Sequence, residues 1–183
     1  MIQEIMFNAW DAHRMGNCQH RPIDIYINDI TGLIIRDYGP GIEPGENDDN
    51  MHDIYCIYGG STKRGQKNQT GGFGLGSKSP FAYTESFTVT SHFGGMKNMY
   101  LISRVSDSNG GKPGMTSLVR VPTTETGLMV TIPLKAGHQE RAYEYIKNIL
   151  FLSGIKAMVH YMDEPDEFID SLILPAGSYI TDD

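Results

Sequence analysis

Three polar residues near the start of the chain have a spacing that could place them on one side of a helix. Glu4, Asn8 and Asp11 stand at positions i, i+4 and i+7, so an α-helix would bring their side chains within about 60° of one another. A carboxylate can act as a general base, and an amide oxygen can bind a hard divalent cation. An ordinary solvent-facing stripe has the same spacing, and taken alone the pattern favours that alternative. His13 falls on the apolar side of this helix, where we expect a core histidine rather than a ligand.

A second candidate is the run Asp37-Tyr38-Gly39-Pro40-Gly41, which directly follows an apolar stretch. An aspartate at the end of a strand would place a carboxylate at the edge of a sheet. The two glycines would let the backbone turn closely around a ligand. A simple β-turn, in which the aspartate accepts a local hydrogen bond, explains the same residues. Both interpretations stay open at the level of sequence.

The third candidate is the glycine-rich run of residues 71–79, GGFGLGSKS. Its glycine spacing differs from the Walker, kinase and dinucleotide-binding patterns. Converging backbone amides, a following helix and the donors on Ser77 and Lys78 nevertheless suit phosphate binding. The alternative is a flexible linker, which the large apolar residues Phe73 and Leu75 disfavour.

Local periodicity indicates which elements would carry these residues. Helical patterns cover Ile2 to Met15 and residues 138–152, the second ending near Gly154, and a short helix would follow the glycines as far as Tyr83. The expected strands are residues 22–28, 33–37, 87–93, 96–105, 116–121, 128–134, 157–161 and 172–174. Two sets of hairpins separated by helices predict an α+β fold. We expect a two-layer α/β sandwich, in which helices cover one face of a mixed, mostly antiparallel sheet.

The composition fits a globular domain. Of 183 residues, 39% are hydrophobic and 20% are charged, which allows a sizeable core and is too apolar for a disordered tail. Fifteen basic residues against twenty-two acidic ones give a formal net charge of −7. We therefore expect no nucleic-acid binding through net charge. Residues 161–183 contain seven acidic residues and no basic one, so the end of the chain differs from its body.

The cysteines and the lengths of the apolar runs indicate the cellular compartment of the protein. Cys18 and Cys56 lie far apart without the spacing of a metal site, as expected in a reducing cytoplasm. No apolar run approaches the roughly 18 residues of a membrane span, and the first residues lack the pattern of a signal peptide. We expect a cytoplasmic protein without a transmembrane segment, and peripheral membrane association stays open.

Taken in order, these motifs resemble the GHKL ATPase superfamily, which includes gyrase B, Hsp90, MutL and histidine kinases. The resemblance covers most of the chain, from Ile2 to about Leu134. Within the superfamily, the run that starts at residue 71 is similar to the RIIA, or rapid-lysis, proteins of tailed bacteriophages. The matching residues are Glu4, Asn8, Asp11 and Ala12 in the helix motif, Asp37, Gly39 and Gly41 in the adenine motif, Ser61-Thr62-Lys63 before the lid glycines, and Gly72, Gly74 and Gly76 as the lid glycines themselves.

The resemblance implies a Bergerat-type ATP-binding domain over residues 1–156, with a lid at about 43–76. Residues 157–183 would be an acidic segment that could begin a following domain. The implied cofactors are ATP and Mg²⁺. The resemblance also assigns a role to each matching residue: Glu4 would polarise the attacking water, Asn8 would bind Mg²⁺, Asp37, Gly39 and Gly41 would hold adenine, and Gly72, Gly74, Gly76, Ser77 and Lys78 would hold the phosphates.

The implied function is slow Mg²⁺-dependent ATP hydrolysis that drives a conformational switch in an RIIA-like phage protein. Such a protein would act in the host bacterial cytoplasm, on a protein partner or an attached downstream domain. We expect slow turnover because Leu128 stands where the family usually has threonine, and because the lysine that gyrase B and MutL bring from a following domain has no recognisable counterpart. The alternatives are a non-hydrolysing nucleotide-binding adaptor and a protein-interaction module with a decayed site.

Overall fold

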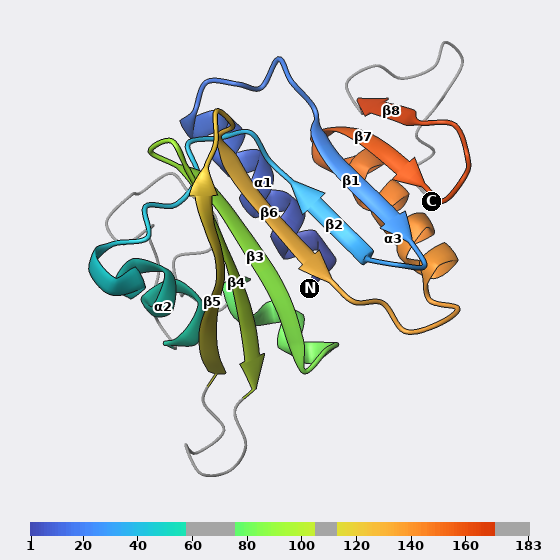
Figure 1. The fold of residues 1–183 in the computed structure, drawn as a ribbon. Coiled ribbons are helices and arrows are strands. Elements are labelled where there is room, and N and C mark those ends of the chain that lie inside the picture. Colours follow the sequence, from blue (N-terminus) through green and yellow to red (C-terminus); the bar gives the residue numbers. More distant parts are fainter. Residues whose placement is uncertain (58–75, 105–112, 171–183) are drawn as a thin grey trace, which may run out of the picture.

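An eight-stranded sheet organises the part of the chain that the computed structural model describes, residues 1–57, 76–104 and 113–170 (Figure 1). The order across the sheet is β5-β4-β3-β6-β2-β1-β7-β8. Among these strands, β1 and β7 pair in parallel and all other neighbours are antiparallel, so the predicted α+β class with a mixed sheet is confirmed. The strands are β1 (Ile23–Asn28), β2 (Gly32–Arg36), β3 (Ser86–Phe93), β4 (Met96–Arg104), β5 (Pro113–Pro122), β6 (Gly127–Ile132), β7 (Lys156–Tyr161) and β8 (Glu167–Asp170).

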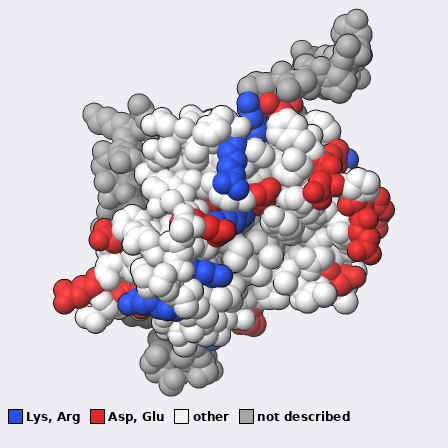
Figure 2. Space-filling model, turned by 45° about the horizontal axis from the view of Figure 1, so that its top comes forward, with Lys and Arg blue, Asp and Glu red and all other residues white. Residues whose placement is uncertain are grey.

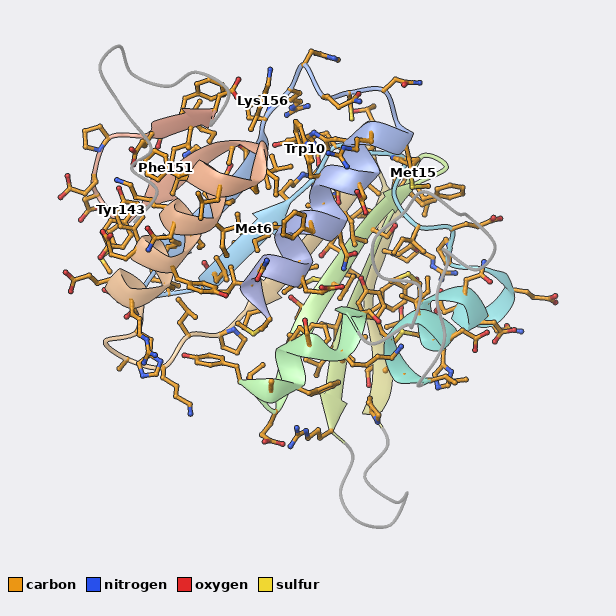
Figure 3. All side chains as sticks on the ribbon, turned by 180° about the vertical axis from the view of Figure 1, so that it is seen from behind. Met6, Trp10, Met15, Tyr143, Phe151 and Lys156 are labelled. Carbon is orange, nitrogen blue, oxygen red and sulfur yellow. The ribbon has the colours of Figure 1, made fainter. Side chains whose placement is uncertain are left out.

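The helices of the described ranges are α1 (Ile2–Met15), η1 (Glu46–Asp48), α2 (Asp49–Cys56), η2 (Gly76–Ala82) and α3 (Gln139–Ser153). Figures 1 and 3 view the molecule from opposite sides; α1 and α3 lie behind the sheet in Figure 1 and in front of it in Figure 3. The short helix α2 lies apart from them and contacts β5. Within these ranges, no helix is both long enough and apolar enough to cross a membrane.

The core forms where the alternation of the strands meets the apolar stripes of the helices. On β1, Ile23, Ile25 and Ile27 are fully buried, whereas the residues between them are only partly buried. Successive side chains of a strand point to opposite faces, so one face of β1 belongs to the core. Met6 and Trp10, which Figure 3 labels on α1, are buried in the same cluster. This packing fixes α1 relative to the sheet.

Most predicted elements are present with small shifts in their bounds. The first helix runs from Ile2 to Met15 as predicted, and the last one ends just before Gly154. Strand β8 was not predicted, because its four residues are too short to show a period. The strand expected at 172–174 lies outside the described residues.

The helix expected after the glycines differs in type from the prediction. The segment Gly76–Ala82 is a 3₁₀ helix with Pro80 inside it. Proline has no N–H and its ring crowds the preceding turn, which disfavours a continuing α-helix. The tighter bonding continues at the end of the segment, where Tyr83 N–H donates to the Pro80 carbonyl at 2.9 Å.

Candidate functional site

A cavity of about 560 Å³ lies where α1, α2 and η2 meet the sheet. Its lining combines carboxylates and amides with apolar side chains, and it draws on segments that are far apart in the sequence. The cavity therefore brings together most of the described residues that the sequence singled out. Those that line it are Glu4, Asn8, Ala12, Asp37, Gly41, Gly76, Ser77 and Leu128.

Helix α1 supplies one wall of the cavity. Glu4, Asn8 and Ala12 line it at positions i, i+4 and i+8, so they follow one side of the helix. Asp11 is not among the described lining residues. Its carboxylate is buried instead beside Arg14, with 3.5 Å between Oδ1 and Nη1. The polar stripe predicted from the sequence thus splits, and two of its three members face the cavity.

The carboxylate of Asp37 lies directly after β2 and is 3% exposed. Its Oδ1 accepts hydrogen bonds from the backbone N–H groups of Gly39 at 2.9 Å and of Leu128 at 3.2 Å. The Asp37 N–H in turn donates to the Leu128 carbonyl at 2.9 Å. Burial raises the pKa of Asp37 to about 7, although the two amides and Arg36 act in the opposite direction. Near neutral pH this group can therefore exist as an acceptor or as a donor.

Close backbone contacts hold the loop that carries Asp37. Gly41 and Gly127 have φ values of +76° and +104°, and a Cβ on Gly127 would lie 2.1 Å from the Asp37 carbonyl oxygen. Gly39 approaches α1 so closely that a Cβ would lie 2.6 Å from the Ala12 carbonyl oxygen. Gly39 is not among the residues that line the cavity. In this structure Gly39 packs the loop against α1, and Gly127 packs the same loop against β6.

His13 supports the same loop from α1. It is fully buried, its Nε2 accepts a hydrogen bond from the Tyr38 N–H at 2.9 Å, and its Nδ1 lies 3.1 Å from the Arg21 carbonyl. Because a carbonyl can only accept, Nδ1 carries the proton. Burial lowers the pKa of His13, so the neutral form persists. The expected core histidine is confirmed, and its positioning role was not visible in the sequence.

A second buried group braces the loop at β2. Arg36 donates from Nη1 to His92 Nδ1 at 3.0 Å, and from Nη2 to Glu125 at 3.1 Å and to the Thr126 carbonyl at 3.2 Å. Burial and the nearby Arg36 charge lower the pKa of His92, which keeps its acceptor nitrogen available. The group joins the ends of β2 and β3 to the turn before β6. Sequence reasoning missed it, because Arg36 is 56 or more positions away from each residue that it bonds.

The segment η2 places Gly76 against Glu4 and ties two residues to α2. Ser77 Oγ donates to the Ile54 carbonyl at 2.6 Å, and the Lys78 ammonium donates to the same carbonyl. Lys78 is buried and is not among the residues that line the cavity. Of the proposed phosphate-binding residues, Gly72 and Gly74 lie outside the described residues, as do Ser61-Thr62-Lys63.

The surface shows charges of both signs. On the face shown in Figure 2, blue Lys and Arg side chains are interspersed with red Asp and Glu side chains and with white uncharged residues. Further acidic side chains gather at the right margin. The turn between β7 and β8 contributes the exposed residues Asp163, Glu164 and Asp166. Among the described residues, no group of three or more His, Cys, Asp or Glu side chains is arranged to hold a metal ion.

Neither the scan against protein-family models nor the search of curated proteins matches this chain. The cavity and the motifs of the sequence therefore carry the functional inference.

Proposed function

We propose that the cavity binds ATP with Mg²⁺ and that residues 1–156 form a GHKL-type ATPase domain. The proposed fold is the Bergerat-type two-layer sandwich, with helices covering one face of the sheet. The observation that carries the proposal is the buried Asp37 carboxylate, which borders the cavity while backbone amides hold one of its oxygens. A volume of about 560 Å³ falls in the range of small-molecule sites, about 300 to 1,000 Å³.

The base would bind at the Asp37 end of the cavity. Both backbone hydrogen bonds to this carboxylate end on Oδ1, so Oδ2 is the oxygen assigned to the ligand. A single acceptor suits the amino group of adenine. The apolar side chains of Ile35, Leu128 and Val130, which line the same cavity, suit the faces of a purine ring.

The phosphates and the cation would lie near α1. Asn8 offers an amide oxygen, a hard ligand of the kind that Mg²⁺ accepts beside phosphate oxygens and water. When bound, the cation would offset the negative charge of the phosphates. Glu4 would orient the water molecule and accept its proton as ATP and water become ADP and phosphate, a role that contributes about 10² to 10⁴ in rate.

A nucleotide-binding adaptor without useful turnover is the second candidate. It is favoured by the position of Lys78, whose ammonium bonds to the Ile54 carbonyl of α2. Among the described lining residues of the cavity there is no lysine or arginine. Transition-state charge on a transferred phosphoryl group usually needs such a cation, so the proposed ATPase is a slow one.

The proposal includes a switch, because part of the proposed lid at 43–76 belongs to the cavity. Helix α2 contributes lining residues and is anchored through Asp48, which accepts from Tyr100 Oη at 2.7 Å and from Arg120. Contacts between a bound nucleotide and α2 would shift the equilibrium between conformations in which the hydrogen bonds of Asp48 are formed and conformations in which they are broken. As in the RIIA-like proteins that the sequence resembles, the switch would act in a host cytoplasm on a protein partner or on a domain after residues 157–183.

Thermal unfolding with and without Mg²⁺-ATP tests the proposal on the natural chain and on Asp37→Asn. Ligand at about 100 times its Kd adds about 2.7 kcal/mol, or roughly 5 to 10 °C in Tm for a chain of this size. We expect the shift in the natural chain and in the control Asp29→Asn, whose aspartate is exposed in the β1–β2 turn, but a much smaller one in Asp37→Asn. No shift in the natural chain would overturn the proposal.

Phosphate release then separates the two candidates. An ATPase should release phosphate with ATP in excess, and Glu4→Ala should abolish the release while ATP still raises the Tm. An adaptor would show the Tm shift and no release in either chain.

A further inference from the structure

The phenol of Tyr55 is a buried polar group at the cavity. Tyr55 is 5% exposed, lines the cavity from α2, and packs its ring edge-on against Phe87 with 6.2 Å between centroids. Within residues 1–57, 76–104 and 113–170, nothing forms a hydrogen bond with its hydroxyl. The hydroxyls of Ser79 and Thr90 also lack partners, but those oxygens are sealed from open space. Tyr55, in contrast, is not among these sealed groups and is one of the residues that line the cavity.

Within the described residues, a hydroxyl at such a position depends on water or on a ligand in the cavity for its hydrogen bond. Wherever the cavity excludes water, the unmet hydrogen bond costs stability, and phenylalanine would fill the same volume without that loss. A ligand that accepts a hydrogen bond in the cavity would remove the cost. The cavity therefore offers a ligand both a hydrogen-bond donor, the hydroxyl of Tyr55, and a hydrogen-bond acceptor, the carboxylate of Asp37.

Electrostatics keep the Tyr55 hydroxyl a donor. Burial and the nearby Asp37 charge both raise the pKa of Tyr55 well above its usual value of 10, so the phenol stays protonated at neutral pH. Leu128 lines the same cavity and has no side-chain donor, so a donor to the ligand has to come from another residue.

We propose that Tyr55 is a specificity-determining residue, whose hydroxyl donates a hydrogen bond to one of the two ring nitrogens, N1 or N7, that flank the amino group of adenine. This inference rests on the proposed function of the cavity. Together, the Asp37 acceptor and the Tyr55 donor match a 6-aminopurine, which presents a donor beside an acceptor. Guanine presents a carbonyl oxygen at position 6, which cannot donate to Asp37.

The substitution Tyr55→Phe removes only the hydroxyl and keeps the ring against Phe87. ADP is the probe for titration calorimetry, because it carries the base and is not hydrolysed. We expect ADP affinity to fall about threefold to tenfold, the usual effect of one neutral hydrogen bond. The Tm of the ligand-free chain should stay equal or rise. The matched control is Tyr145→Phe, which removes a hydroxyl from a tyrosine on α3 that is 47% exposed, and it should change neither value.

Deaza analogues of ADP identify the atom that is contacted. One of two analogues, 1-deaza-ADP if the acceptor is N1 or 7-deaza-ADP if it is N7, lacks the acceptor nitrogen. The natural chain and Tyr55→Phe should bind that analogue equally well. For 3-deaza-ADP the variant should show its full loss. A purely structural effect of the substitution would weaken every analogue by the same factor, and that outcome would overturn the inference.

The outcomes also separate this inference from the proposal on which it rests. If the natural chain binds no ADP, both the proposed function and the role of Tyr55 are wrong. If the natural chain binds ADP and Tyr55→Phe binds it equally well, only the inference about Tyr55 is wrong. A large fall in the Tm of ligand-free Tyr55→Phe would also overturn it, because the hydroxyl would then have a partner in the protein itself.

Discussion

The backbone of Gly76 lies against the carboxylate of Glu4. A Cβ on Gly76 would lie 2.3 Å from Glu4 Oε1 and 2.8 Å from its Cγ, closer than Cβ atoms approach other atoms. The obstructing atoms belong to a flexible side chain and not to the backbone. A small side chain at position 76 would therefore displace the Glu4 carboxylate and leave the backbone where it is.

This contact predicts that Gly76→Ala lowers ATP turnover with little effect on stability. The carboxylate that would orient the attacking water loses its position, and a misplaced catalytic group costs up to about 10²-fold in rate. Phosphate release measures the turnover, and the Tm should change by only a few degrees. In a Glu4→Ala background the second substitution should have no further effect on turnover, since the obstructed atoms are gone. Unchanged turnover in Gly76→Ala would contradict the prediction.

The burial of Asp37 predicts that Asp37→Asn stabilises the ligand-free chain at alkaline pH. The pKa of this carboxyl is raised from 3.8 to about 7. Between these values the folded chain holds a proton that the unfolded chain has lost, so stability falls as the pH rises through this window. Above about pH 7 the full cost is present, at most roughly 4 kcal/mol for three pKa units. Asparagine offers the same amides an oxygen acceptor without the charge.

The measurement is the Tm of both chains without ligand at pH 4.5 and pH 8. The variant should be the more stable chain at pH 8, and its advantage should shrink at pH 4.5. The exposed control Asp29→Asn should show no such change with pH. If Asp37→Asn is instead less stable than the natural chain at pH 8, the carboxylate contributes to the fold in its charged form and the argument is wrong.

The same titration predicts how nucleotide affinity depends on pH. The amino group of adenine needs the carboxylate form of Asp37 as its acceptor. As the pH falls below about 7, the ligand-free chain takes up a proton at Asp37, so ADP affinity should fall by up to about tenfold per pH unit. The phosphates of ADP titrate too, but equally for both chains. The ratio of the affinities of the natural chain and Asp37→Asn isolates the effect, and a ratio that is constant from pH 5.5 to 8 would contradict it.

The parts of the fold that depend on local periodicity could be predicted from the sequence. Alternation at Ile23, Ile25 and Ile27 indicated a strand with one buried face, and the helical spacing of Glu4 and Asn8 placed both on one side of α1. These are properties of neighbouring residues, and tertiary packing did not override them. The sheet order and the parallel pairing of β1 with β7 depend on which strands meet, which no local pattern encodes.

The supports of the candidate site could not be predicted, because each joins distant segments. Gly127 directly precedes the strand expected at residues 128–134 and carries no local signal of a contact, and only the structure shows that a Cβ there would collide with the Asp37 carbonyl. Lys78 followed the glycines as a phosphate ligand would, whereas its bond to the Ile54 carbonyl depends on how α2 packs against η2. Side-chain type indicates which chemistry is available, and packing decides where it is used.

The position of His13 predicts a loss of both stability and affinity in His13→Ala. The substitution leaves the Tyr38 N–H and the Arg21 carbonyl without their partner and opens a cavity beneath the loop. Unsatisfied buried groups cost about 1 to 3 kcal/mol each, so we expect a loss of roughly 3 kcal/mol, or about 6 to 12 °C in Tm. ADP affinity should fall too, because the loop holds Asp37. The exposed control His20→Ala should behave as the natural chain does.

The pH dependence of this loss tests whether His13 is buried in its neutral form. Burial lowers the pKa of His13 below 6.5, so in acid the unfolded chain takes up a proton before the folded chain does. The stability that His13 contributes is therefore fully present above pH 6.5 and declines as the pH falls. The difference in Tm between the natural chain and His13→Ala should shrink from pH 8 to pH 5. A difference that is independent of pH would show that the folded chain takes up this proton as readily as the unfolded chain, and it would contradict a buried neutral His13.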